Sequence, residues 1–244
     1  YDITSDDGIQ HTLWVVDDPE LVKSLTGLFD EIPALYIADG HHRSASACKV
    51  GLKRREEHPD YTGDEEFNFF MAVIFPDNDL KIFDYNRVVK DLNGNTSEEF
   101  LEKIREAGFD VEEKGSDIYY PEGKHIFAMF LDGKWYKLTA RDSIIPDHVT
   151  ESLDVAVLQN SLLHPILGIE DPRTDERICF MGGNHRLKDL AAAAGETGGA
   201  AFAMYPTSME ELMSIADEGK LMPPKSTWFE PKLRSGLFIH KLSE

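Results

Sequence analysis

The alternation of apolar and polar residues predicts short strands interleaved with amphipathic helices along the chain. At the amino end, two short apolar runs flank Asp7-Gly8, a dipeptide that supplies the positive φ angles of a tight hairpin turn. Asp18-Pro19 then predicts a helix start, with the aspartate as N-cap and the proline in the first turn. Leu21, Leu25 and Leu28 follow at helical spacing, which extends this helix to about residue 30.

The remaining pattern predicts a mixture of both element types. Helices are expected at residues 43–57, 96–107, 153–163, 183–194 and 207–217. Strands are expected at residues 34–38, 67–75, 80–84, 110–113, 125–131, 135–139, 177–181, 200–205 and 237–240. The strands at 67–75 and 80–84 are expected to pair around the turn at residues 76–78, and those at 125–131 and 135–139 are joined by Asp132-Gly133. Thr96 with Glu99, and Thr207 with Glu210, have the spacing of capping boxes. Because strict βαβ alternation is missing, the fold class is predicted as α+β, a mixed α/β protein.

The composition indicates a folded, acidic protein. Hydrophobic residues make up 41% of the 244 residues, which is enough apolar side chain for a substantial core. The 25 Lys and Arg against 45 Asp and Glu give a formal net charge of −20. This charge disfavours nucleic acid and anionic membranes as partners, because both are bound through clustered cations. A small anionic ligand stays possible, since a few local donors overcome a field that salt screens over about 8–10 Å.

Cysteine usage and hydropathy narrow the class further. The two cysteines, Cys48 and Cys179, form no CxxC pair, so neither a disulfide framework nor a zinc knuckle is expected. Cys48 is predicted on the apolar, core-facing side of its helix. No apolar stretch reaches the roughly 20 residues of a membrane helix, and no signal peptide opens the chain, so a cytoplasmic protein is expected. Because the chain begins at Tyr1, we interpret it as a fragment that lacks an amino-terminal region.

Residues 37–43 contain the densest candidate chemistry. The expected strand ends at Asp39-Gly40, and His41, His42 and Arg43 open the following helix. Free N–H groups at a helix start form an anion site, glycine lets a ligand approach the backbone, and arginine adds a forked pair of donors. Asp39 has the chemistry to hold Mg²⁺ or to accept a proton from a hydroxyl group.

Structural alternatives exist for this motif. Asp-Gly is common turn chemistry, and the three basic residues also suit a solvated first turn of a helix. A metal site built from Asp39, His41 and His42 is disfavoured, because adjacent side chains rarely point the same way.

Three weaker candidates lie elsewhere. Lys225, Ser226 and Thr227, with Lys232 and Arg234, form a basic cluster that either neutralises phosphate or is a solvated loop. Asn86 and Arg87, just after an expected strand, either reach the same pocket, or Arg87 is a structural ion-pair partner. Residues 182–186, Gly-Gly-Asn-His-Arg, echo the first motif without its aspartate, and we favour coincidence there.

The stretch Ile37-Ala-Asp-Gly-His-His-Arg-Ser-Ala-Ser-Ala resembles the phosphate-binding signature of the ParB/sulfiredoxin superfamily, and within it the free L-serine kinases. The rest of the chain is similar to the family called domain of unknown function 1015. The matching segments are residues 83–94, 153–175 and 222–236. The resemblance implies a ParB/sulfiredoxin-like core at residues 1–92, an α+β insertion at 93–150 and a C-terminal α/β part at 151–244.

The resemblance also implies roles for individual residues. Gly40, His41, His42 and Arg43 would contact nucleotide phosphates. Apart from the resemblance, Lys225 and Ser226 of the basic cluster are candidate further contacts. Asp39 would lie beside the transferred phosphoryl group and hold the metal, and Asp39 and His42 are the expected catalytic residues. The serine kinases also use an upstream glutamate as general base, for which this chain offers no secure match. The nearest acidic residues are Asp17, Asp18 and Glu20, and Asp18 is already expected to cap a helix.

Two functions follow as hypotheses. The first is an enzyme that uses ATP or ADP, with Mg²⁺, to phosphorylate the hydroxyl of a small metabolite, with free L-serine as the first candidate. The second is a nucleotide-binding regulatory module without turnover. A DNA-associated role by analogy with ParB is disfavoured by the net charge of −20. Oligomeric state is not predicted.

Overall fold

The structure is a computed structural model that describes residues 1–242, and it divides into two compact units. The first unit, Tyr1–Ile37, holds strands β1 (Asp2–Thr4) and β2 (Gln10–Thr12) and helix α1 (Pro19–Asp30). The two strands pair antiparallel, which confirms the predicted hairpin. Helix α1 also begins as predicted, because the Asp18 carboxylate accepts the N–H groups of Glu20 and Leu21 at 2.9 and 3.1 Å.

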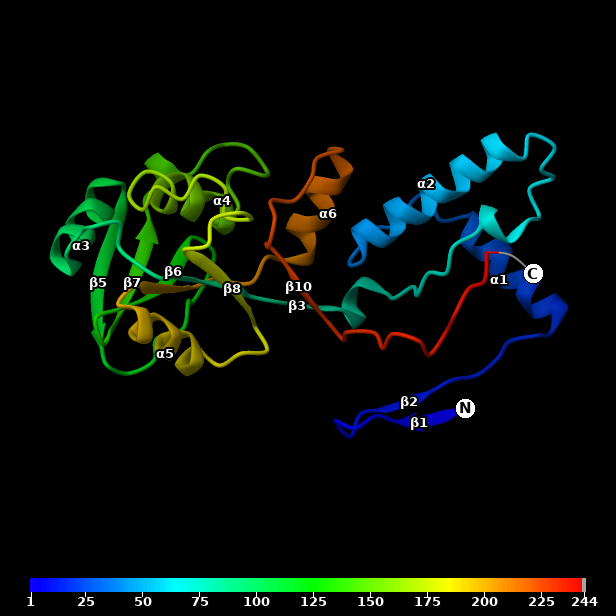
Figure 1. Cartoon of the computed structure of the whole chain (residues 1–244), viewed down its shortest axis with the longest axis horizontal. Helices are drawn as coiled ribbons and strands as arrows, with labels where there is room; N and C mark the ends of the chain where they lie inside the picture. The colour runs from blue at the N-terminus through cyan, green and yellow to red at the C-terminus, as the bar shows by residue number, and fades with distance from the viewer. Residues whose placement is uncertain (243–244) are drawn as a thin grey trace. The chain divides into compact units, whose positions relative to one another are not determined.

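The second unit, Ala38–Glu244, is built on an antiparallel sheet of six strands in the order β5-β7-β6-β9-β4-β8 (Figure 1). Its strands are β4 (Tyr85–Val89), β5 (Phe109–Gly115), β6 (Ile126–Leu131), β7 (Lys134–Ala140), β8 (Ile178–Gly182) and β9 (Ala200–Ala203). Its helices are α2 (His41–Glu57), α3 (Ser97–Glu106), α4 (Asp154–Leu158), α5 (Leu187–Thr197) and α6 (Met209–Asp217). The mixed α+β class is therefore confirmed.

Strand alternation sends side chains to two different cores. In β6, Phe127 and Met129 face the larger cluster, which includes Phe100 of α3 and Leu158 of α4. The intervening Ala128 faces the smaller cluster, which α5 covers from the other side of the sheet. Figure 1 shows α3 and α4 on one face and α5 on the other. Both faces of the sheet are thus buried within this unit.

Helix α2 packs against a short 3-10 turn, Glu66–Asn68. Gly51 is buried in this contact, where a Cβ atom would lie 2.9 Å from the carbonyl oxygen of Phe67. Arg55 donates to the side chain of Asn68 at 2.7 Å. A larger residue at position 51 would therefore separate the helix from the turn.

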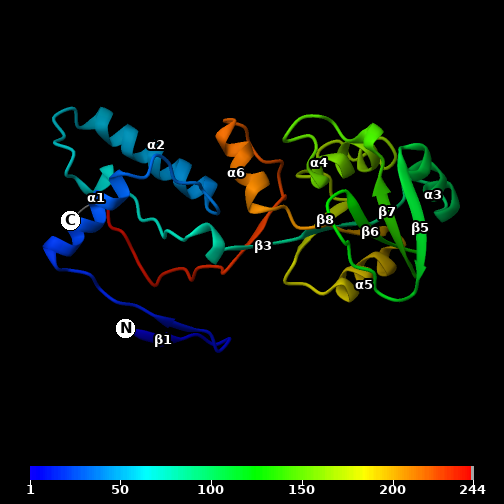
Figure 2. The same ribbon diagram turned by 180° about the vertical axis from the view of Figure 1, so that it is seen from behind.

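The C-terminal segment connects the sheet to the region of α2. Strand β10 (Trp228–Glu230) pairs antiparallel with β3 (Lys81–Phe83). Beyond β10 the chain runs back toward α2 (Figure 2). There His240 Nε2 lies 2.7 Å from the Glu66 carboxylate, and Arg54 donates to the carbonyl of Leu242 at 3.0 Å.

Several predicted elements are wrong. Residues 34–38, 67–75 and 237–240 form no strand: Phe67 and Asn68 belong to the 3-10 turn, and the other residues pair with no neighbouring strand. Strand β3 pairs with β10 instead of with residues 67–75. The predicted strand 80–84 therefore ends early, and β4 follows it, where no strand was expected. These errors share a cause. An apolar run forms a strand only where another backbone segment lies beside it, and the local sequence does not show whether such a partner is present.

Two further details differ from the prediction. Helix α6 is capped by Ser208 with Glu211, one residue later than expected, because the hydroxyl of buried Thr207 donates to the carbonyl of Ser226. Cys48 is exposed rather than buried in the core. Among residues 1–242, no helix has the length and apolar character required to cross a membrane.

A partly exposed histidine, His125, contacts a buried carboxylate, Asp154, at the start of β6. His125 adopts a left-handed backbone conformation with φ 64°, and its N–H donates to Asp154 Oδ1 at 2.9 Å. Asp154 is 8% exposed, and its Oδ2 has no hydrogen-bond partner. Burial raises the pKa of Asp154 to about 7, against the opposing effect of the His125 N–H. Burial also lowers the pKa of His125.

The raised pKa of Asp154 predicts a pH-dependent stability. Between its ordinary value of 3.8 and about 7, the folded chain holds a proton that the unfolded chain releases. The protonated carboxyl group therefore adds to the free energy of unfolding. This added stability is fully present below pH 3.8 and is lost as the pH rises to about 7. Asp154→Asn stays neutral, so its free energy of unfolding relative to wild type should rise by about 2–3 kcal/mol from pH 5 to pH 8. Denaturant titrations followed by circular dichroism measure this difference.

The control variant is Asp171→Asn. Asp171 pairs with Arg173 at the surface, and hydrogen bonds from Arg173 lower its pKa to about 2, so its effect should not change above pH 5. If the difference in free energy of unfolding between wild type and Asp154→Asn is constant from pH 5 to pH 8, Asp154 is not protonated in the folded protein.

Candidate functional site

The Asp39-Gly40 turn opens helix α2 without a side-chain cap. Gly40 is the N-cap residue, with φ 85° and ψ 27°, and no side chain caps the helix. The first intrahelical bond runs from Ser44 N–H to the Gly40 carbonyl at 2.9 Å, so the N–H groups of His41, His42 and Arg43 have no intrahelical acceptor. Helices α1, α3 and α6, in contrast, each carry a side-chain cap. The start of α2 therefore keeps donors available for an anion.

Arg43 folds back over this turn. A Cβ atom at position 40 would lie 3.1 Å from Arg43 Nη2 and 3.2 Å from Nε. Glycine is thus required at position 40 both for its positive φ and for the space that the guanidinium occupies. The side chains of His41 and His42 are exposed on the same first turn of the helix.

The Asp39 carboxylate is held by two donors, one from the neighbouring residue and one from a distant part of the chain. Oδ1 accepts the N–H of Gly40 at 2.7 Å, and Oδ2 accepts Lys232 Nζ at 2.9 Å. Partial burial pushes the pKa of Asp39 upward, but the hydrogen bonds from Lys232 and Gly40 outweigh it and leave the pKa below its usual value. Asp39 is therefore a carboxylate at neutral pH.

Lys232 is placed by an aromatic pair. Its Nζ lies 5.0 Å from the centroid of the Trp228 ring. Trp228 meets Tyr85 edge-on, with 5.6 Å between centroids, and Lys225 Nζ lies 5.6 Å above the Tyr85 ring. The structure thus brings two of the basic residues of segment 222–236 to this aromatic pair, and Lys232 also to Asp39.

Arg87 anchors this segment from inside the protein. It is 3% exposed, and it donates to the carbonyls of Tyr85 at 2.6 Å and of Lys225 at 3.1 Å. Its guanidinium also lies 5.5 Å from the centroid of the Phe180 ring. Burial lowers the pKa of Arg87 to about 10, so it stays charged at neutral pH. Arg87 is therefore a structural anchor that bonds to carbonyls and not the ion-pair residue of the sequence hypothesis.

The residues around this anchor are also fixed by polar contacts. Lys225 has a left-handed backbone with φ 57°. Ser226 is buried, its hydroxyl donates to the Pro223 carbonyl, and its own carbonyl accepts from Thr207 at 3.4 Å. The hydroxyl of Ser226 is thus used within its own turn, and its predicted role as a nucleotide contact stays a prediction.

Asn86, the other residue of the Asn86-Arg87 candidate, is buried beside the anchor. Its Oδ1 accepts the N–H of Met204 at 2.9 Å, and its Nδ2 donates to the Asp84 carboxylate. Burial raises the pKa of Asp84, and the hydrogen bond from Asn86 opposes this shift. Asn86 therefore joins β4 to the end of β9.

The Gly-Gly-Asn-His-Arg segment has packing reasons for both glycines. A Cβ atom at Gly182 would overlap the Trp228 ring, and one at Gly183 would lie 2.6 Å from Asp84 Oδ1. At the start of the following helix α5, the Asp189 carboxylate accepts the N–H of Arg186 at 3.2 Å and places a negative charge there. These contacts explain the segment without a phosphate ligand.

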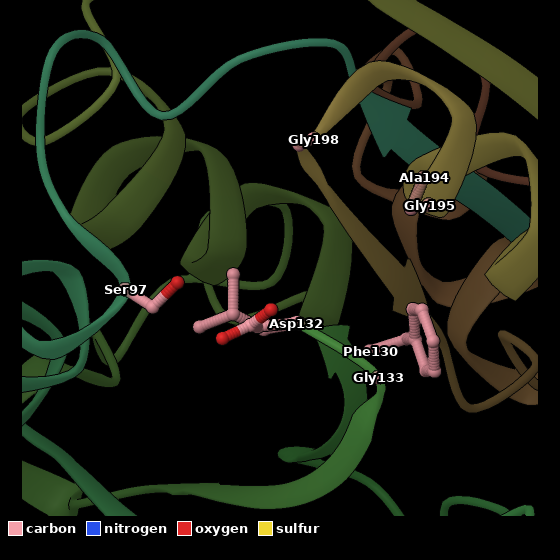
Figure 3. A pocket seen from close by; sticks show the side chains of 9 residues that line it. Ser97, Phe130, Asp132, Gly133, Ala194, Gly195 and Gly198 are labelled. Carbon is pink, nitrogen blue, oxygen red and sulfur yellow. The ribbon is translucent and has the colours of Figure 1, made fainter.

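A separate cavity of about 180 Å³ lies at the β6–β7 turn (Figure 3). It is lined by Ser97, Asp132, Phe130 and Leu131 together with Gly133, Ala194, Gly195, Gly198 and Gly199. The lining carries one carboxylate and one hydroxyl but no cationic side chain. This chemistry does not suit a phosphate group, and the cavity contains none of the predicted site residues.

Metal-ligating side chains are dispersed in the described part of the chain. Across residues 1–242, no three His, Cys, Asp or Glu side chains gather in a cluster that could hold a metal ion. Asp18, one of the acidic residues considered as a base, caps α1. Asp39 is thus a single carboxylate beside an uncapped helix start.

The fold and the sequence together identify the class of the protein. It is a mixed α+β protein, and the family model described as protein of unknown function (DUF1015) matches residues 1–156. This match covers more than half of the chain, so the chain belongs to that family. Comparison with curated protein sequences gives no match.

Solved structures similar to this chain include two free serine kinases and a protein from Pyrococcus furiosus. A free serine kinase in complex with AMP is 15% identical, with 88% of this chain and 81% of that chain covered and a TM-score of 0.42. A mutant free serine kinase with AMP is 16% identical, with 86% and 78% covered and a TM-score of 0.43. The conserved hypothetical protein from Pyrococcus furiosus is 17% identical, with 86% and 81% covered and a TM-score of 0.44.

The anchoring role of Arg87 predicts a local effect of its removal. Arg87→Met keeps the apolar volume but leaves two carbonyl oxygens without their donor. Because a hydrogen bond to a charged group contributes about 1.5–3 kcal/mol, amide exchange in residues 222–230 should become at least about 10-fold faster. Hydrogen-exchange mass spectrometry measures this rate.

Arg177→Met is the matched control for the anchor. Arg177 also donates to carbonyls, those of Leu167 and Gly168, but it lies on another segment, so exchange in residues 222–230 should not change. Equal exchange of residues 222–230 in Arg87→Met and wild type would show that Arg87 does not hold the segment.

Proposed function

We propose that this protein is a nucleotide-dependent phosphotransferase that acts on the hydroxyl group of a small metabolite, with L-serine as the first candidate. The observation that carries the proposal is the turn at Asp39-Gly40, where three backbone N–H groups and the Arg43 guanidinium converge at an uncapped helix start. Such a start attracts phosphate through both its N–H groups and its partial positive charge.

The local charge supports a phosphate ligand in a chain of net charge −20. Arg43 and Lys232 both lie at the turn, and Lys225 lies on the adjoining aromatic pair. These cations offset the distant acidic residues, whose field salt screens over about 8 Å. ATP or ADP is the proposed phosphate donor, and His41 and His42 are further proposed contacts on the same helical turn.

Asp39 gives the turn a second chemistry. Magnesium in phosphoryl-transfer sites is held by one or two carboxylates together with substrate phosphates, and Asp39 supplies one such carboxylate beside the helix start. When bound with a nucleotide, the ion would neutralise charge on the phosphate oxygens. The proposed catalytic residues are Asp39, which holds or orients the reacting groups, and His42, which stands three residues along the same turn.

One observation favours the regulatory module as a second candidate. Both oxygens of Asp39 already accept hydrogen bonds, from Gly40 and from Lys232. These hydrogen bonds hold the pKa of Asp39 below its usual value, so in this arrangement the carboxylate is a weak base toward a substrate hydroxyl. A protein that kept this arrangement with nucleotide bound would bind phosphate without transferring it.

Arg43→Ala tests the phosphate site. Loss of a charged hydrogen-bond donor should weaken ATP or ADP binding by about 1.5–3 kcal/mol, without unfolding the protein, because the side chain is exposed. Arg43→Lys should restore only part of this affinity, since an ammonium group does not reproduce the guanidinium fork. Calorimetric titration measures both. If Arg43→Ala binds as wild type does, the side chain belongs to a solvated helix surface.

Asp39→Asn separates the enzyme from the binding module. The substitution keeps the size of the side chain but removes its charge, so phosphoryl transfer to serine should fall by about 10²-fold or more. Nucleotide affinity without metal should stay equal or rise, because a negative charge beside the phosphates is lost. Turnover is measured by phosphoserine formation. Equal turnover in both proteins would refute the catalytic role, and nucleotide binding without any transfer would favour the module.

A further inference from the structure

The contact between Lys232 and Asp39 joins residues that are 193 positions apart. Both partners are largely exposed, with side-chain exposures of 42% and 53%. An exposed ion pair contributes about 0–1 kcal/mol to stability. This gain is small for ordering a long segment that contains several prolines, so stability alone is a poor explanation of the contact.

The segment that carries Lys232 is, however, fixed more firmly than a surface ion pair requires. Buried Arg87 bonds to the carbonyl of Lys225, and buried Ser226 and Thr207 close the next turn. Strand β10 then pairs with β3, and Trp228 presents its ring to Lys232. These internal contacts thus place the Lys232 ammonium at the Asp39-Gly40 turn.

The position of Lys232 at that turn is specific. Asp39 Oδ1 accepts the N–H of Gly40, and Asp39 Oδ2 accepts the Lys232 ammonium. The same carboxylate therefore links Lys232 to the backbone that opens α2. A lysine ammonium has three donors on a flexible stem, which allows it to change partners with little movement of the backbone. A phosphate carries more negative charge than a single carboxylate and competes for the same ammonium.

We propose that Lys232 is a phosphate-binding residue of this site, which Asp39 holds in readiness and releases to the phosphate of an incoming nucleotide. The proposal rests on the proposed function, because it assigns a further contact in the same site. Release of Lys232 also removes the hydrogen bond from Asp39 Oδ2. That oxygen would then be free to bind the metal or to orient the substrate hydroxyl, as the proposed function requires.

Lys232→Met tests this role in metal-free ADP binding. The variant keeps the aliphatic stem over Trp228 but lacks the ammonium, and its ADP affinity should fall by about 10- to 100-fold, the loss of one charged hydrogen bond. Lys232→Arg should retain most of the affinity. Lys241→Met, an equal loss of charge further along the same segment, should bind ADP as wild type does. Isothermal calorimetry in EDTA measures all four proteins.

A double-mutant cycle tests the exchange of partners. Asp39→Asn should raise metal-free ADP affinity more strongly when Lys232 is present than in the Lys232→Met background, because only then is an ammonium released to the ligand. Additive effects would overturn the exchange. Equal ADP binding by Lys232→Met and wild type would overturn the phosphate contact while leaving the proposed function intact. If wild type binds neither ADP nor ATP, the proposed function and this inference both fail.

Discussion

The buried guanidinium of Arg87 is the interaction on which the arrangement of the candidate site depends. A charge in the interior is costly unless its hydrogen bonds are satisfied, and here two backbone carbonyls satisfy it. One of these belongs to Arg87's own strand β4, and the other belongs to Lys225, 138 residues away. The sheet therefore fixes where the C-terminal segment begins, and β10, Trp228 and Lys232 follow from that point.

The electrostatics of the site follow from the same geometry. In a chain of net charge −20, a phosphate is attracted only where cations are gathered locally. The turn at Asp39-Gly40 gains Arg43 from its own helix, but Lys232 reaches it only through the anchored segment. The lowered pKa of Asp39 reflects this arrangement, since the hydrogen bonds from Lys232 and Gly40 outweigh the effect of partial burial. The two segments thus bring the Arg43 guanidinium, the Asp39 carboxylate and the Lys232 ammonium together at this turn.

The sequence predicts the features that depend on neighbouring residues and misses those that depend on contacts between distant segments. The start of α2, the hairpin of β6 and β7 and the cap of α3 depend on neighbouring residues, so spacing and turn chemistry predict them. Residues 67–75 form no strand because pairing depends on a partner backbone, and β3 finds that partner in β10. The same limit applies to the site: the motif at residues 39–43 is visible in the sequence, whereas nothing near Lys232 indicates that it reaches Asp39. The basic cluster of Lys225, Lys232 and Arg234 is the available signal, and it does not specify which lysine approaches the turn.

If the Asp39-Gly40 turn and the Trp228–Lys232 segment form one nucleotide site, ADP bound at the turn should be detected by Trp228. Titration with ADP, followed by tryptophan fluorescence in wild type and in Trp228→Phe, examines this coupling. Because the Lys232 ammonium lies 5.0 Å from the Trp228 ring, its transfer to a phosphate should change the emission of that residue. We expect a saturable change in the emission of wild type, with the same midpoint as calorimetric binding, and no such change in Trp228→Phe. Calorimetric binding of ADP with no fluorescence change, or with a change that persists in Trp228→Phe, would contradict it.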